Sequence, residues 1–305
     1  MTPVAGNPKT GASGSSTIRA AIWMTGAIGS FSAMAVAGRE LSSALDTFEL
    51  MMYRSLVGVV IVLIVAARAR TLSQITFARF NLHLFRNLAH FAGQNLWFYA
   101  LPLIPLAQVF ALEFTTPLWV LLLAPFFLGE KLTRLRAMAA ALGFSGILLV
   151  ARPDVGGINA GVLSVTLAAV GFAATTILTK RLTRTDSITT ILFFLTTMQA
   201  VFGIVTAGYD GRIALPDVQT APWILIVGFA GLLAHFCITN ALRIAPAVVV
   251  IPFDFARLPV IAIIGVLFYG EALDLLAFVG ALVIFGANYM TIRAETKSVP
   301  VRPPL

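Results

Sequence analysis

The stretch "PLAQVFALEFTTPLWVLLLAPFFLGE", Pro105 to Glu130, occurs a second time as "PAVVVIPFDFARLPVIAIIGVLFYGE", Pro246 to Glu271. A shift of 141 positions superposes the opening prolines, the acids Glu113 and Asp254, and the closing Gly-Glu pairs. The same shift lays Gln94 over His235, and one residue of slippage lays Asp46 over Asp186. The chain therefore contains two copies of one plan, each about half its length.

Composition decides the class of protein. Hydrophobic residues make up 59% of the 305 residues and charged residues only 11%, and the mean hydropathy is +0.93. These values lie far outside the range of soluble domains. The chain is expected to be an all-α integral membrane protein, because a backbone in lipid must satisfy its own hydrogen bonds and no stretch alternates like a barrel strand.

Ten apolar segments of roughly 17 to 24 residues are long enough to cross a hydrocarbon core about 30 Å thick. They lie at about Ile18–Gly38, Phe48–Ala67, His83–Leu101, Leu106–Leu128, Leu135–Ala151, Ile158–Thr179, Ile188–Ala207, Pro222–Leu242, Ala247–Tyr269 and Leu273–Ile292. The first repeat is expected at 18–151 and the second at 158–292, flanked by a disordered cytoplasmic tail at 1–17 and a cytoplasmic tail at 293–305. The one cysteine, Cys237, excludes an intramolecular disulfide.

The net charge of +8 could suggest a nucleic-acid partner, but the positions of the charges favour membrane orientation. With the N-terminus inside, most Lys and Arg residues fall in cytoplasmic segments, and the opposite face has only Arg39, Arg152 and Arg212. This asymmetry follows the positive-inside rule. It places both termini in the cytoplasm. We therefore expect the protein in the inner (cytoplasmic) membrane and expect no nucleic-acid partner.

Five spans per repeat is an odd number, so the second repeat must enter the membrane from the opposite side. Two inverted copies around a central cavity are common in secondary transporters, because exchanging their conformations opens the site to either compartment by turns. A membrane enzyme or scaffold that happened to duplicate is the alternative.

The third segment, "HLFRNLAHFAGQNLWFYAL", carries a polar stripe at helical spacing. His83 and Arg86 are expected at the cytoplasmic interface, whereas His90 and Gln94 lie deeper and line a wet cavity. The tryptophan and its two aromatic neighbours at the outer end are typical of an interfacial belt, although one could wall a substrate site. No acidic or cysteine partner stands at helical spacing, so no metal site is predicted.

Charged residues inside the spans are the strongest site candidates, because a charge in lipid is costly unless it is paired or wetted. Arg54 either snorkels outward or faces the bundle interior and meets a carboxylate, and the interior is favoured, with Asp46 and Glu49 as the nearest acids in sequence. Glu113, Asp254 and Arg257 are expected in a salt-bridge network, the last two as an i,i+3 pair. Structural pairing, substrate contact and gating all remain open for this network.

The two Gly-Glu pairs end the fourth and ninth segments. Glycine can adopt the left-handed conformation that stops a helix, and a glutamate at the start of the next helix complements its positive end. The alternative is a hinge. Residues expected to serve in gating or ion pairing are Arg54, Gly129, Glu130, Gly270 and Glu271. Prolines within these segments, including Pro117 and Pro259, are expected to kink them.

Two repeats with a proline opening the fourth helix, a second proline in "FTTP" and "RLP", and a terminal Gly-Glu resemble the EamA-type drug/metabolite transporters, over Ile18 to Arg293. Within them the chain most resembles the YddG-type amino-acid and metabolite exporters. The resemblance implies a cavity lined by the first, third, fourth, sixth, eighth and ninth helices. It implies substrate-binding or cavity roles for Trp23, His90, Gln94, Glu113, Trp119, His235, Asn240, Asp254 and Arg257. The second repeat has Phe194 where the first has Arg54, so any role of that arginine is not symmetric.

The sequence thus predicts a secondary transporter that exports amino acids or related small metabolites by alternating access. Sugar phosphates, nucleotide sugars or drugs are alternative substrates, although phosphorylated ones want several intramembrane cations. An enzyme is not favoured, since no nucleophile-base or metal spacing is present. No catalytic residue, cofactor or metal is expected. The expected partners are a small-molecule substrate and membrane lipid. The protein is expected to be a monomer or homodimer.

Overall fold

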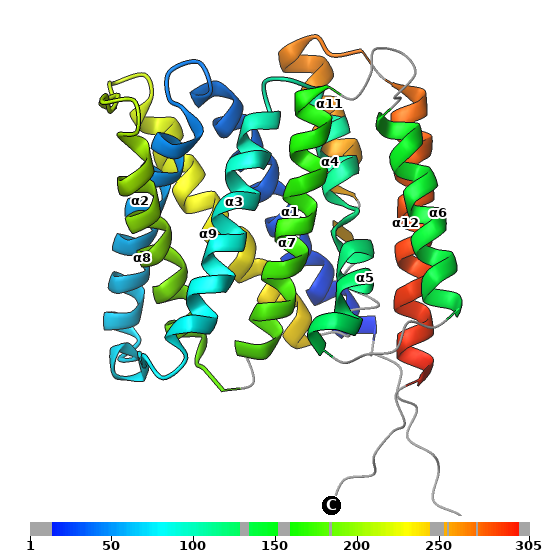
Figure 1. The fold of residues 1–305 in the computed structure, drawn as a ribbon, viewed down its shortest axis with the longest axis horizontal. Coiled ribbons are helices and arrows are strands. Elements are labelled where there is room, and N and C mark those ends of the chain that lie inside the picture. Colours follow the sequence, from blue (N-terminus) through cyan, green and yellow to red (C-terminus); the bar gives the residue numbers. More distant parts are fainter. Residues whose placement is uncertain are drawn as a thin grey trace, which may run out of the picture.

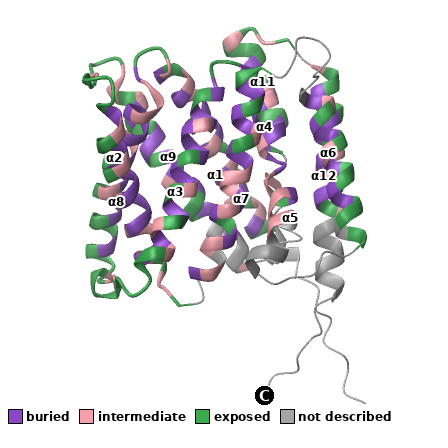
Figure 2. Cartoon of the chain, in the orientation of Figure 1, coloured by how far each residue is buried: buried purple, intermediate pink, exposed green. Residues whose placement is uncertain are grey.

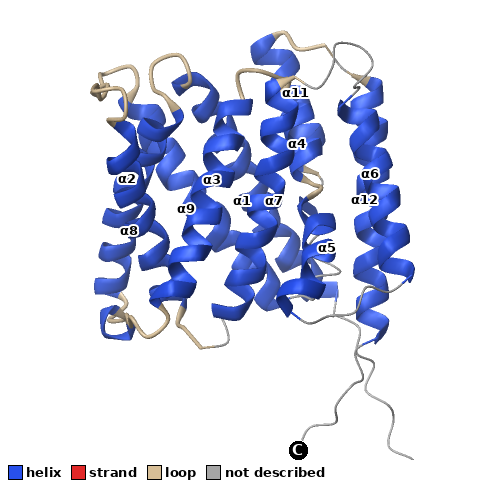
Figure 3. Ribbon diagram, in the orientation of Figure 1, coloured by secondary structure: helices blue, strands red, loops and turns tan. Residues whose placement is uncertain are grey.

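The structure is a computed structural model that describes residues 14–128, 134–151, 159–182, 185–244, 253–254, 256–272 and 274–298. Every regular element in these ranges is a helix (Figure 3). The α-helices are α1 (Gly14–Leu41), α2 (Thr47–Arg68), α3 (Phe80–Ala100), α4 (Leu106–Glu113), α5 (Thr116–Leu128), α6 (Arg134–Ala151), α7 (Ala160–Leu182), α8 (Ile188–Ala207), α9 (Ala221–Ile244), α11 (Arg257–Tyr269) and α12 (Leu275–Ser298), with a short 3₁₀ turn η1 (Leu72–Gln74). Helix α1 begins and α12 ends inside the segments expected to be tails, since residues 14–17 and 293–298 are helical.

The two halves keep the same register. Helices α2 and α8, α3 and α9, α5 and α11, and α6 and α12 each begin 141 residues apart. Asp46 caps α2 and Ser187 caps α8, each accepting a hydrogen bond from a backbone N–H three residues on. The slippage that paired Asp46 with Asp186 is therefore wrong, because equivalent caps fall on Asp46 and Ser187 without it.

Helices of the two halves pack in pairs. Helix α1 packs against α9, α3 against α7, α2 against α8, α4 against α11, and α6 against α12 (Figure 1). Exchanging the halves turns α1–α9 into α7–α3 and leaves α2–α8 and α6–α12 unchanged. Helix α1 begins and α12 ends at the lower edge of Figure 1, and α6 and α12 stand together at one side. The packing therefore has an approximate two-fold symmetry that relates one repeat to the other.

Glycines allow several of these helix pairs to approach closely. A Cβ at Gly203 of α8 would lie 2.6 Å from the Cα of Met52 in α2, and one at Gly171 of α7 would lie 3.0 Å from the carbonyl of Ala89 in α3. Small residues at such crossings let apolar helices pack by backbone contact, which a bilayer does not otherwise drive.

The fourth apolar segment is two helices rather than one kinked helix. Helix α4 ends at Glu113 and α5 begins at Thr116, just before Pro117. A proline at this position cannot donate to the carbonyl of Glu113, which accepts a hydrogen bond from the Thr116 hydroxyl at 2.7 Å instead. The break leaves the Glu113 side chain at a helix end deep in the bundle.

Five helical stretches are long and apolar enough to cross a membrane: Ile18–Leu41, Thr47–Arg68, Ala160–Thr179, Ile188–Ala207 and Ala221–Ile238. Four more are apolar but shorter: Leu106–Val120, Ala137–Val150, Arg257–Tyr269 and Leu275–Met290. Large hydrophobic side chains such as Val205, Leu267 and Phe268 are exposed, and exposed positions follow the outward faces of the helices (Figure 2). An apolar exterior of this kind suits lipid rather than water.

Candidate functional site

Two acids and one arginine meet where the end of α4 lies near residues 253–254 and the start of α11. The Nη2 atom of Arg257 lies 3.2 Å from Oε1 of Glu113 and 3.3 Å from Oδ2 of Asp254. The arginine side chain is 3% exposed, whereas the Glu113 and Asp254 side chains keep 18% and 23%. The indole N–H of Trp97 donates to the second oxygen of Glu113 at 2.8 Å. The predicted network is thus present, and it leaves one excess negative charge.

Aromatic rings surround the guanidinium of this triad. The Cζ atom of Arg257 lies 4.7 Å from the ring centre of Phe31, 4.8 Å from that of Phe110 and 5.0 Å from that of Phe114. Ring faces stabilise a buried cation. The Oδ1 atom of Asp254 is buried and accepts no hydrogen bond from the described part of the chain. An acceptor in this state is available to a cationic or hydrogen-bond-donating ligand.

A second polar site, here called the axial cavity, lies among α2, α3, α8 and α9. It is lined by Arg54, Ser55, Gly58, His90, Gln94, Leu195, Thr196, Gln199, Gly228, Gly231, Leu232 and His235. Ten of these residues form five pairs related by the 141-residue shift: 54 with 195, 55 with 196, 58 with 199, 90 with 231, and 94 with 235. A cavity built from equivalent positions of both repeats lies on the axis that relates them.

The two sides of the axial cavity differ in chemistry. Arg54 is equivalent to Leu195, His90 to Gly231, and Gln199 to Gly58. Gly231 makes room for the arginine, because a Cβ there would lie 2.9 Å from Nη2 of Arg54. The equivalent of Arg54 is therefore Leu195 and not Phe194.

Arg54 has no carboxylate partner in the described part of the chain, contrary to expectation. Its guanidinium donates to the sulfur of Met51 at 3.7 Å and lies 5.8 Å from the ring centre of Phe98. The two nearby acids are used elsewhere, since Asp46 and Glu49 form the capping box of α2 and Glu49 also accepts the N–H of Ala214. A partly buried cation within a membrane span that has no countercharge among the described residues is costly and marks a candidate functional site.

Three polar atoms at the axial cavity are also unsatisfied among the described residues. They are Nδ1 of His90, Oε1 of Gln94 and Oε1 of Gln199, on side chains that are 6%, 6% and 3% exposed. Buried polar groups are nearly always hydrogen-bonded, so such atoms at a cavity call for a water or a ligand. His235 also lines the cavity and keeps an exposed surface there.

Aromatic residues connect the two polar sites. The ring of Phe31 lies between Arg257 and His235, with its centre 5.7 Å from that of His235. On the other side Trp97 touches both Glu113 and Phe98, and Phe98 lies beneath Arg54. Trp97 and Phe98 are 2% and 1% exposed, so the prediction of an interfacial belt is wrong for them. The triad, the axial cavity and these rings are called the central chamber below.

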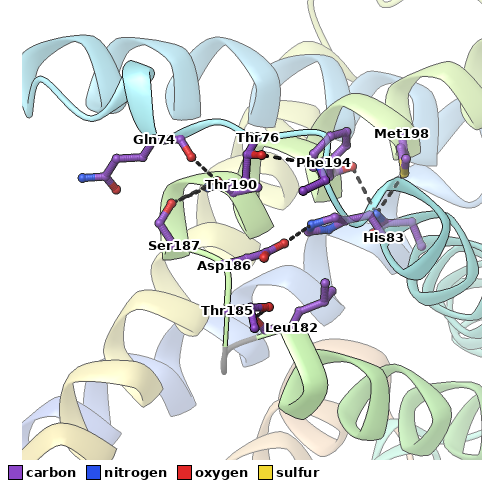
Figure 4. A network of polar contacts seen from close by, with 12 residues as sticks. Gln74, Thr76, His83, Leu182, Thr185, Asp186, Ser187, Thr190, Phe194 and Met198 are labelled. Atoms are coloured by element: carbon purple, nitrogen blue, oxygen red, sulfur yellow. Dashed lines mark hydrogen bonds and ion pairs between the residues drawn. The ribbon is translucent and has the colours of Figure 1, made fainter.

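His83 belongs to a seal at the lower end of the bundle and not to a solvent interface. Its Nε2 lies 2.8 Å from Oδ2 of Asp186, with side-chain exposures of 0% and 3%, and its ring stacks on Phe194 (Figure 4). Thr190 beside it donates to the carbonyl of Gln74 at 2.7 Å. The sequence spacing did not reveal this pairing because Asp186 is more than one hundred residues from His83.

Arg86, one turn before His90, is also buried, at 6% exposure, and contrary to expectation does not lie at an interface. It donates to the side-chain oxygens of Thr179 and Asn87 at 3.1 and 2.7 Å. Both Arg54 and Arg86 act electrostatically on His90 and His235. The chamber therefore has a positive side around α2 and α3.

Glu271 locks the upper end of the bundle. Its carboxylate pairs with Arg39 of α1 and accepts the N–H of Leu106, the first residue of α4, at 3.0 Å. The preceding Gly270 has φ +61° and ends α11, as predicted. The expectation that Glu271 complements the next helix is wrong, because Asp274 caps α12 while Glu271 complements the positive end of α4. Gly129 and Glu130 lie outside the described residues.

Three candidates lie apart from the central chamber. Trp23 packs edge-to-face on Phe236, 5.8 Å between centres. Trp119 donates to the Thr115 hydroxyl at 3.1 Å and packs edge-to-face on Phe144 of α6. Asn240 donates to the carbonyl of residue 236 in its own helix at 2.9 Å. His90, Gln94, Glu113, His235, Asp254 and Arg257 are brought together, joined by Arg54.

Phe31 and Gln199 belong to the chamber although the sequence did not single them out as candidates, whereas for Trp97 a place in the wall of a substrate site was the alternative to an interfacial belt. For Gln199 a signal existed, since it is a lone amide in an apolar segment opposite Gly58 in the repeat. Among the described residues no group of three potential ligands could hold a metal ion. A larger hollow of about 600 Å³ between α2 and α9, lined by Leu56, Val60 and Phe229 among others, has only apolar walls on the lipid-facing exterior.

These features define a helical, multi-pass membrane protein with a polar chamber between two repeats. The model of the EamA-like transporter family matches residues 18–152 and again 159–293, and the chain belongs to this family. It is 33% identical over 223 residues to a riboflavin transporter of Brucella anthropi, covering 72% of this chain and 78% of that protein. It is 27% identical over 279 residues to an S-adenosylmethionine uptake transporter of Rickettsia bellii, covering 91% and 94%.

A riboflavin transporter of Vibrio cholerae is 31% identical over 223 residues, covering 72% of this chain and 74% of that protein. One solved crystal structure matches the fold with a TM-score of 0.62 at 18% identity, covering 92% of this chain and 99% of that one. The protein is a transporter of small metabolites. The named relatives are uptake or riboflavin transporters and do not single out the amino-acid exporters.

Proposed function

We propose that this protein takes up a zwitterionic, amino-acid-derived metabolite across the cytoplasmic membrane, with S-adenosylmethionine as the leading candidate. The observation that carries the proposal is the separation of charge in the central chamber. Among the described residues Arg54 has no carboxylate partner at one end, and Glu113 and Asp254 share Arg257 at the other.

A substrate with both signs of charge satisfies both ends. Its carboxylate would meet Arg54, a cationic group would meet the spare oxygen of Asp254, and a flat ring would lie against Phe31 and Trp97. S-adenosylmethionine has all three parts, and the full-length similarity to uptake transporters for it supports this choice.

Transport would proceed by alternating access between ten crossings arranged as two inverted repeats with both termini in the cytoplasm. Support comes from the helix pairing, which is preserved when the repeats are exchanged, and from the axial cavity on their common axis. The cavity holds only about 30 Å³, room for one or two waters. Substrate entry therefore requires the helices to move.

Two other substrates have specific support. Riboflavin is favoured by relatives 31% and 33% identical to this chain, and its flat ring suits the aromatic rings of the chamber. Export of amino acids uses the same zwitterion chemistry in the opposite direction, but the similarity to S-adenosylmethionine uptake transporters favours uptake.

The test is uptake into liposomes that contain the purified protein. Radiolabelled S-adenosylmethionine is offered outside, with unlabelled S-adenosylmethionine, riboflavin and a panel of amino acids as competitors. We expect saturable uptake that S-adenosylmethionine blocks and riboflavin does not. Parallel assays use labelled riboflavin and labelled amino acids. Uptake of riboflavin alone would transfer the proposal to riboflavin, uptake of amino acids alone would favour the amino-acid carrier, and flat uptake of all three labels would remove the proposed substrates.

A further inference from the structure

We infer that the axial cavity is the subsite for an α-amino-carboxylate head group, in which Arg54 binds the carboxylate and Gln94 and Gln199 accept from the ammonium. The inference rests on the proposed function, since it names the part of the substrate that this cavity would hold. It starts from three groups without full partners among the described residues: Arg54, Gln94 and Gln199.

Arg54 supplies the cation of the proposed subsite. Arg54 is partly buried in α2, its guanidinium contacts a sulfur and an aromatic ring, and no described carboxylate reaches it. A guanidinium presents several parallel donors that fit a carboxylate in a bidentate manner. Arg86 adds positive potential on the same side, because its own partners are two neutral oxygens. This side of the cavity therefore favours an anion.

Two glutamine side chains supply the hydrogen-bond acceptors of the subsite. Oε1 of Gln94 and Oε1 of Gln199 are buried at the cavity and accept no hydrogen bond within the described chain. A carboxylate cannot satisfy them, because it offers no proton, whereas an ammonium group offers three. An arginine beside two amide acceptors therefore matches a carboxylate beside an ammonium, which is the arrangement at the Cα of an amino acid.

The two repeats place different residues at equivalent positions of the axial cavity, so the cavity itself is asymmetric. The positions equivalent to Arg54 and His90 are Leu195 and Gly231, and the position equivalent to Gln199 is Gly58. Two arginines at equivalent positions would repel each other, and an apolar leucine matches Arg54 instead. A glycine matches His90 and another matches Gln199, and these glycines leave space on the axis, where both repeats can keep contact with a substrate as they exchange shapes.

The first experiment needs no ligand. Replacing Arg54 with leucine, the residue at its symmetry mate, removes an uncompensated buried charge, so the variant should melt at a higher temperature than the wild type. The control is Arg68→Gln, which removes an exposed charge from the same helix and should leave the melting temperature unchanged. A lower melting temperature for Arg54→Leu would mean that the arginine is structural and would overturn the inference.

The second experiment measures binding to the purified wild type and to Arg54→Gln. S-adenosylmethionine should bind the variant about 10- to 100-fold more weakly, whereas its decarboxylated analogue should bind both proteins equally. Equal losses for both ligands, or no loss for either, would contradict the carboxylate contact. Gln199→Leu should weaken both ligands, since both retain the amino group.

A third arm separates failure of this inference from failure of the proposed function. If S-adenosylmethionine does not bind the wild type, the proposed substrate is wrong, and glycine and acetamide then decide the subsite alone. Glycine should raise the melting temperature of the wild type and not of Arg54→Gln, while acetamide should affect neither. No difference between glycine and acetamide would remove the head-group subsite.

Discussion

At the scale of single residues, the triad of Glu113, Asp254 and Arg257 gives the sharpest prediction. Replacing Arg257 with glutamine leaves two neighbouring carboxylates without a cation, and breaking a buried ion pair from one side costs about 3–5 kcal/mol. We expect the low end of this range, because the acid side chains remain 18% and 23% exposed. Thermal unfolding in detergent measures the loss.

The matched control removes the charges together. The triple variant Glu113→Gln, Asp254→Asn, Arg257→Gln should recover most of the lost stability, since no uncompensated charge remains, while substrate uptake stays abolished. A triple variant as unstable as the single one would mean that packing of the arginine against its three aromatic rings, and not charge balance, sets the stability.

At the scale of helices, the crossing of α2 and α8 depends on Gly203. A Cβ there would lie 2.6 Å from Cα and 2.8 Å from N of Met52, and backbone atoms cannot rotate away. Gly203→Ala should therefore force the helices apart and cost about 1–3 kcal/mol in thermal unfolding. Gly286→Ala in α12 is the control, since a Cβ there meets nothing within 4 Å and should not destabilise. Equal melting temperatures for the two variants would refute close packing at this crossing.

The helices themselves were largely predictable from hydropathy and from the repeat, and their partners were not. Hydropathy places α2 and α8 within a residue or two, because their apolar runs end at caps such as Asp46. The break at Glu113 could be anticipated from Pro117, but its extent depends on a hydroxyl that replaces the missing backbone donor.

Contacts between distant segments were the least predictable. Sequence chemistry identified Glu113, Asp254 and Arg257 because charges in apolar segments are rare. It could not show that Asp186 pairs with His83, that Glu271 crosses to Arg39, or that Arg54 has no such partner in the part of the chain that the structure describes. Each depends on which helix faces which, and this follows from packing and not from local spacing.

At the scale of the whole molecule, the Arg39–Glu271 ion pair allows a test of whether the two repeats separate during transport. Glu271 ties α1 and the start of α4 to the end of α11, so one repeat is held against the other at the upper end of the bundle. If the protein works by alternating access, these elements must separate once in each cycle.

Cysteines at 39 and 271, in a chain whose single native cysteine at 237 is replaced by alanine, can be joined by a bifunctional thiol reagent. The joined protein should lose uptake and regain it when a reductant cleaves the link, because the upper end can no longer open. Each single-cysteine variant treated with the same reagent controls for loss of the ion pair and for bulk. Full uptake by the joined protein would mean that substrate passes without separation of the repeats, and the two-fold arrangement of the chamber would then need another explanation.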